Sequence, residues 1–173
     1  MEIVTPWEVN PFVSGLFLRE DYKDGVQYSY FTMKIPVPGY LVAIACGDLE
    51  REWIGDSRVY VITEHLGMEA ALAELDNLED GIKKIEEYTG VEYVWEIYQI
   101  LILPPSFPFG GMENPLLTFA SPTIIVGDKS EVSVANHEIA HSWSGNLVTN
   151  MNWDCFWLNE GFTVFLERKV SKL

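Results

Sequence analysis

The chain has 173 residues, 48% of them apolar and 21% charged, and its 26 acidic and 11 basic side chains give a net charge of −15. This composition is typical of a globular protein with a real core, and the length fits one domain, or one small domain with a piece of another. The negative charge repels phosphate backbones, which argues against nucleic-acid binding. The sequence contains no run of eighteen apolar residues that would predict a membrane span.

Two features bear on the cellular compartment. Cys46 and Cys155 lack the spacing of a disulfide framework, so we expect free thiols in a reducing environment. The first residues, MEIVTPWEVNPF, lack the basic start and apolar stretch of a signal peptide. A cytoplasmic location is the resulting expectation.

In chain order, the first half of the sequence predicts mainly strands. The segments rich in β-branched, aromatic or aliphatic residues and bounded by turn signals are 26–35, 41–47, 57–63, 96–103 and 123–127. We expect the segment 41–47 to be buried. Between the third and fourth strands, apolar residues from Met68 to Ile85 recur at helical spacing, and Gly90 is placed to end that helix. The pattern is mixed α and β, with a boundary near residue 50.

A second helix is predicted over residues 129–144. Asp128 followed by Glu131 fits a capping box at its start, and Gly145 is a suitable C-terminal stop. His137 and His141 then lie one turn apart on the same face.

The pattern H-E-x-x-H on a helix directs two imidazoles toward one metal ion. A catalytic zinc site needs three protein ligands and an open position, and Glu160 is the third candidate. Glu160 opens a further helix whose predicted apolar stripe is Phe162, Phe165, Leu166 and Val170. Glu138 would face the open position as a general base. The alternative to a metal site is that His137 and His141 are two ordinary core histidines. The alternative to a general base is that Glu138 is a surface or capping carboxylate.

The segments LPPSFPFGGMENP, HEIAHSWSGNLVTN and WDCFWLNEGFTVFLER resemble the M1 family of zinc aminopeptidases (gluzincins), and within it the leukotriene A4 hydrolase and aminopeptidase B branch. The resemblance implies one Zn²⁺ per chain, held by His137, His141 and Glu160, with Glu138 as general base. It also implies that GGMEN binds substrate. The residues of that motif are Gly110, Gly111, Met112, Glu113 and Asn114.

Glu113 would hold the free α-amine of a peptide, and the two glycines would let backbone N–H groups approach the scissile carbonyl. Without the resemblance, this segment reads as a turn. The implied fold is α+β, with residues 1–50 as the end of an N-terminal β-domain and 51–173 as part of a thermolysin-like catalytic domain. The implied activity is removal of N-terminal residues from peptides, and epoxide hydrolysis is a further implication of the branch.

The alternative is a zinc-binding module with little catalysis of its own. The family's transition-state tyrosine and second lobe would follow these 173 residues, so we expect slow hydrolysis by the chain alone. Among the other residues, we expect His65 at the surface and Thr163 in a hydrogen bond behind the metal site. Asn136 should face away from the metal. Three tryptophans are expected in the core: Trp143, Trp153 and Trp157.

Overall fold

The computed structural model of the chain describes residues 1–172 and contains three β-sheets and four α-helices in that range. Strands β1 (Glu2–Pro6), β4 (Val26–Thr32) and β3 (Leu16–Lys23) form an antiparallel sheet in that order, and β2 (Asn10–Val13) pairs with β5 (Ile44–Gly47). The five-stranded sheet has the order β6 (Glu50–Trp53), β7 (Val59–Thr63), β8 (Tyr98–Ile102), β10 (Thr118–Ala120) and β9 (Gly111–Met112). Its three central strands are parallel and its edge strands antiparallel.

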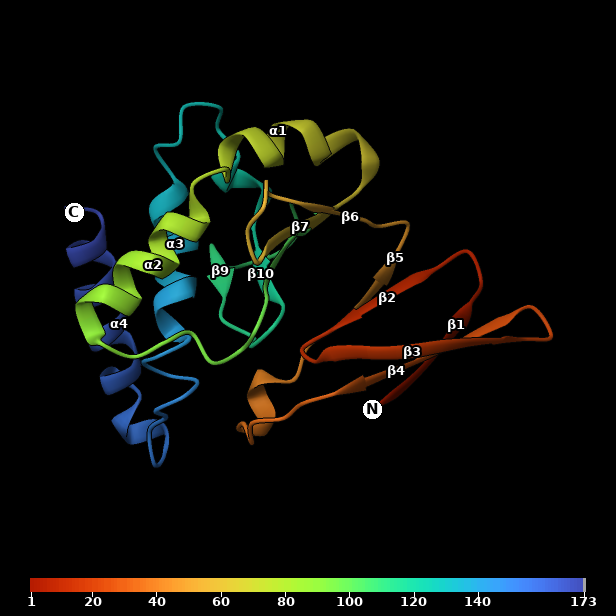
Figure 1. Cartoon of the computed structure of the whole chain (residues 1–173), viewed down its shortest axis with the longest axis horizontal. Coiled ribbons are helices and arrows are strands. Elements are labelled where there is room, and N and C mark those ends of the chain that lie inside the picture. Colours follow the sequence, from red (N-terminus) through yellow and green to blue (C-terminus); the bar gives the residue numbers. More distant parts are fainter. Residues whose placement is uncertain (173) are drawn as a thin grey trace.

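The helices are α1 (Met68–Glu74), α2 (Leu78–Thr89), α3 (Val132–His141) and α4 (Trp157–Val170). Short 3-10 turns occur at Gly39–Leu41, His65–Gly67, Pro122–Ile124 and Trp153–Cys155. Figure 1 shows α2, α3 and α4 gathered on one side of the five-stranded sheet, while β1, β3 and β4 project from the other end of the molecule. The predicted α+β class is confirmed. No helix within residues 1–172 is long and apolar enough to cross a membrane.

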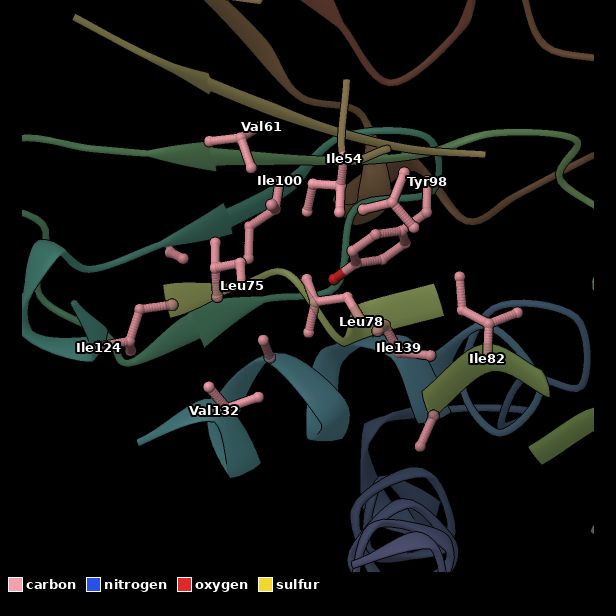
Figure 2. Close-up of a cluster of buried hydrophobic side chains, with 14 of the residues drawn as sticks. Ile54, Val61, Leu75, Leu78, Ile82, Tyr98, Ile100, Ile124, Val132 and Ile139 are labelled. Atoms are coloured by element: carbon pink, nitrogen blue, oxygen red, sulfur yellow. The ribbon is translucent and has the colours of Figure 1, made fainter. Parts of the chain in front are cut away.

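The main core lies between the five-stranded sheet and the helices (Figure 2). All five residues of β8 are buried, because helices cover one face of the sheet and β2 and β5 side chains pack near the other. Leu78, Ile82 and Ile85 of α2 and Ile139 of α3 are completely buried. Full burial of each such side chain contributes about 1.5–3 kcal/mol. This packing fixes α3 from behind, and its opposite face carries the two histidines.

The single helix expected from Met68 onward is two helices. Asp76 and Asn77 interrupt it, because short polar side chains favour turns over helix interiors. Glu74, at the end of α1, is buried and its carboxylate accepts the backbone N–H groups of Gly127 and Lys129 at 2.8 and 2.9 Å. Gly90 ends α2 in the left-handed conformation, with φ of 68°, as predicted.

The same contact explains why α3 starts at Val132 and not at residue 129. Glu74 holds Lys129 in a turn with φ of 62°, outside the helical range. The Asp128 carboxylate accepts from the Ser130 N–H at 3.0 Å, and the expected capping box with Glu131 is not formed. The helix ends at His141, three residues earlier than predicted.

Two predicted strands are also corrected. Residues 123–127 do not form a strand, because the Ser121 hydroxyl accepts from the Thr123 N–H and Pro122 begins a 3-10 turn. The buried strand expected over 41–47 is shortened to β5, which pairs only with β2 and leaves Ile44 half exposed. It is therefore an edge element rather than a central strand.

Candidate metal centre

The two histidines of α3 and Glu160 in the first turn of α4 point their donor atoms at one spot. The Nε2 atoms of His137 and His141 are 3.1 Å apart. The Glu160 carboxylate oxygens lie 3.4 Å from His137 Nε2 and 3.6 Å from His141 Nε2. Ligands at about 2.0–2.1 Å from a tetrahedral zinc ion are about 3.3 Å from one another. The three separations therefore match three ligands of one such ion.

The far side of each imidazole is also occupied. His137 Nδ1 lies 3.1 Å from a carboxylate oxygen of Glu167, and His141 Nδ1 lies 2.9 Å from the Ser144 carbonyl oxygen. Thr163 Oγ1 is 3.0 Å from the same Nδ1 of His141. A carbonyl or carboxylate can only accept, so both Nδ1 atoms carry a proton, and in the neutral imidazoles both Nε2 atoms present lone pairs. A cation between them would satisfy two lone pairs that face each other, and this donor set fits zinc.

The electrostatic surroundings favour positive charge at this spot. Burial lowers the pKa of His141, but its contact with Glu160 and the nearby Glu113 and Glu138 carboxylates outweigh burial and raise it. The hydrogen bond with His141 in turn lowers the pKa of Glu160. A divalent cation would satisfy the same excess of negative charge.

Two further carboxylates, Glu138 and Glu113, are buried beside the ligands. Their exposed fractions are 5% and 6%. Burial is the main cause that raises the pKa of the Glu138 carboxyl to about 8, and neighbouring carboxylates add to it. Glu113 Oε1 is 4.0 Å from His141 Nδ1 and has no hydrogen-bond partner in the described chain. Neither carboxylate belongs to the group of His137, His141 and Glu160, although both lie close enough to His141 to form a second group of possible ligands with it.

These side chains border one cavity of about 370 Å³. Its lining residues are Gly110, Gly111, Glu113, Ser133, Val134, His137, Glu138, His141, Glu160 and Glu167. A larger cavity of about 640 Å³, bordered mainly by apolar side chains near β5 and α1, contains none of the candidate ligands. The donor chemistry, and not the size of the cavity, identifies the site.

Two residues of the GGMEN segment do not line the site cavity. Met112 lies in β9 opposite Phe119. Asn114 is buried and its amide donates to the Leu41 carbonyl oxygen at 3.2 Å. Both therefore support the segment that presents Glu113 and the two glycines to the cavity.

Among the secondary expectations, Thr163 makes the hydrogen bond behind His141, and His65 is exposed beside Glu50. Asn136 packs against Gly81 of α2, away from the ligands. Trp143 is buried as expected. Only one side of α4 is covered by α2 and α3, so Phe162 and Phe165 of the predicted apolar stripe are exposed, and so is Trp157, which was expected in the core. Trp153, also expected in the core, lies in the 3-10 turn before α4 and is exposed as well.

The sequence reasoning missed Glu167. Its position seven residues after Glu160 places it two turns along the same face of α4. That spacing, together with the rule that a metal-binding histidine donates its other N–H to an acceptor, could have identified it.

Comparisons with known proteins show the family to which the chain belongs. Residues 73–172 match the family model described as the peptidase family M1 domain. The chain is 51% identical to a leukotriene A-4 hydrolase of Xenopus laevis over 98% of its length, and 46% identical to a leucine aminopeptidase 2 of Lodderomyces elongisporus over 91%. It covers only 28% and 24% of the lengths of those two relatives.

Solved structures give the same result. Native yeast LTA4 hydrolase superimposes with a TM-score of 0.88 at 42% identity, over 98% of this chain and 26% of that one. The yeast enzyme in complex with bestatin gives 0.87 at 41% identity, again over 98% of this chain and 26% of that one. The chain thus spans about a quarter of the length of these relatives. Because the family model covers more than half of its 173 residues, the chain belongs to peptidase family M1.

Proposed function

We propose that the chain carries the metal centre of a zinc-dependent aminopeptidase that removes the N-terminal residue from peptides. The observation that supports this most strongly is that three ligand atoms at tetrahedral spacing share one cavity with two buried carboxylates that are not ligands. Relatives named leucine aminopeptidase, and a related hydrolase solved with bestatin, favour the same activity. Activity, substrate and metal remain proposals, because the chain covers only about a quarter of these relatives.

When bound, zinc would supply Lewis-acid polarisation of the carbonyl and would lower the pKa of water to about 7. His137, His141 and Glu160 would hold the ion, while Glu167 and the Ser144 carbonyl keep the two rings oriented. Their fixed hydrogen bonds leave no freedom to rotate the Nε2 atoms away from the cation.

Glu138 would act as the general base. Its carboxylate borders the cavity next to the ligands and takes the proton of the attacking water, then passes it to the leaving amine. Burial favours its protonated form, which suits a group that must hold a proton during the reaction. A nearby divalent cation would counter this effect and keep the carboxylate ready to accept the proton.

Glu113 would bind the protonated α-amine of the substrate. Its buried carboxylate faces the cavity, and one of its oxygens has no partner within the described residues. An ammonium group brings three donors and a full positive charge, which together satisfy such an oxygen. An anion fixed beside the metal restricts cleavage to the first peptide bond.

The second candidate function, a zinc site that only joins α3 to α4, is less well supported. Structural zinc sites usually have four closed protein ligands, whereas the group of two histidines and a carboxylate formed by His137, His141 and Glu160 has three. A purely structural site would also have no use for the buried Glu138 and Glu113 carboxylates, whose desolvation is costly.

The test compares leucine p-nitroanilide with its N-acetylated twin, using the zinc-loaded chain and a chelator-treated control. We expect turnover of the free amine only, and loss of that preference in Glu113→Gln. Glu131→Gln removes the same charge from the exposed start of α3 and should change nothing. Equal turnover of the two substrates by the wild-type chain would contradict the amine-binding role, and activity that survives chelation would contradict the zinc mechanism.

A further inference from the structure

The loop that follows α3 connects a proposed metal ligand to the segment that carries Glu113. Asn146 lies in this loop and is only 3% exposed. Its side-chain amide donates to the Glu113 backbone carbonyl at 2.7 Å, and its backbone N–H donates to the His141 carbonyl at 3.0 Å. Asn146 is therefore hydrogen-bonded both to the proposed metal ligand His141 and to Glu113.

The geometry of the loop leaves Asn146 little freedom. Gly145 has a φ of 132°, a conformation that side-chain-bearing residues rarely adopt, and a Cβ there would lie 2.9 Å from His141 Nδ1. The Gly145 N–H donates to the Val148 carbonyl at 2.8 Å, which closes the turn. The backbone thus folds tightly against the His141 ring and directs the Asn146 side chain to Glu113.

Unsatisfied polar atoms are concentrated at the same place. Within residues 1–172, five buried side-chain nitrogen or oxygen atoms have no hydrogen-bond partner, and three of them belong to Glu113, Asn114 and Asn146. Such atoms are costly, and in native proteins they occur preferentially where function requires them. Asn146 does not line the site cavity, so any effect on a ligand must pass through the residues it contacts, Glu113 by its side chain or His141 by its backbone.

We propose that Asn146 is a positioning residue for recognition of the α-amine, an inference that rests on the proposed aminopeptidase function. Its amide fixes the Glu113 backbone at a set position relative to His141, and so sets the separation between the amine-binding carboxylate and the metal. The acceptor is a carbonyl, so only a donor can make this bond. An aspartate at position 146 would place a carboxylate oxygen against the Glu113 carbonyl oxygen, and the hydrogen bond would be lost.

Binding measurements test the proposal without relying on turnover. Leucine hydroxamate and N-acetyl-leucine hydroxamate are titrated into the zinc-loaded chain by calorimetry, and the ratio of their affinities reports the contribution of the amine. The variants are Asn146→Ala and Asn146→Asp. The matched control is Gln99→Glu, because Gln99 is also buried and its amide donates to the Leu116 carbonyl at the same 2.7 Å, outside the site cavity.

We expect the wild-type chain and Gln99→Glu to prefer the free amine by roughly 10- to 100-fold, the range of a hydrogen bond to a charged group. In both Asn146 variants, the ratio of the two affinities should fall most of the way to one, while zinc content and affinity for the acetylated ligand stay at the wild-type level. Asn146→Asp adds a negative charge that by itself favours an amine, so a loss in this variant assigns the effect to the missing donor.

The other outcomes overturn the proposal in distinguishable ways. A ratio that stays at the wild-type value in both Asn146 variants would remove the positioning role and leave the proposed function intact. Equal weakening of both ligands, loss of zinc, or unfolding of both variants would show that Asn146 only supports the fold. A wild-type chain that does not discriminate between the two ligands would instead contradict the amine-binding role of Glu113, and this inference with it.

Discussion

Replacement of Glu167 by glutamine should weaken zinc binding although Glu167 is not a ligand. Its carboxylate oxygen lies 3.1 Å from His137 Nδ1 and both side chains are about one-fifth exposed, so solvent screens this contact only partly. Loss of such a partner typically costs 10- to 100-fold in metal affinity, or about 1.4–2.8 kcal/mol. Glutamine can still accept the Nδ1 proton through its carbonyl, so we expect roughly a 10-fold loss. Glu167→Ala removes the acceptor and should approach 100-fold.

The assay is competition for zinc between each variant and a chromophoric chelator at neutral pH. Glu131→Gln controls for the change in net charge, since Glu131 is exposed and precedes α3. Wild-type affinity in both Glu167 variants, alongside a clear loss in His137→Ala, would refute the view that the carboxylate orients this ligand. A complete loss in Glu167→Gln would instead suggest that Glu167 binds the metal directly.

Three further predictions concern the site and its support. Thr163→Val should weaken zinc binding less than Glu167→Ala does, because the Ser144 carbonyl still accepts from His141 Nδ1; an equal or larger loss in the same competition assay would contradict this. Glu138→Gln should retain zinc but lower peptide hydrolysis by about 10²- to 10⁴-fold, the usual contribution of a positioned base, and a variant that cannot bind zinc would make Glu138 a ligand. A hydrogen bond from the Arg58 side chain lowers the pKa of Glu86 below the ordinary value of 4.5. The ionised form of Glu86 therefore stabilises the fold above that pH. The difference in urea midpoint between wild type and Glu86→Gln should therefore shrink as the pH falls below 4.5, and a constant difference would exclude this linkage.

The parts of the site that could be predicted from sequence depend on local spacing. His137 and His141 share a helix, so a separation of four residues alone places them on one face. Gly90 could be assigned as a helix stop because its local conformation does not depend on distant contacts. Glu160 could be named only as a candidate third ligand at the start of a second helix, a role that the family resemblance also implied, because its position depends on the packing of α4 on α3.

The failed predictions involve contacts between distant parts of the chain. Glu74 determines where α3 begins by accepting two backbone N–H groups more than fifty residues away, and no short pattern reveals such a contact. The amide of Asn146 reaches Glu113 across 33 residues in the same way. Phe162 and Phe165 follow helical spacing but are exposed, because periodicity indicates an apolar face without stating what covers it.

Metal analysis of the purified chain and its three single histidine variants tests the central claim most directly. His65 provides the control, since it is exposed and pairs only with Glu50. After gel filtration in the presence of trace zinc, we expect about one equivalent in the wild type and in His65→Ala, as a single tetrahedral site requires. His137→Ala and His141→Ala should each lose most of the metal. Full zinc retention in both of these variants, or equal loss in all three, would contradict the assignment of the metal centre.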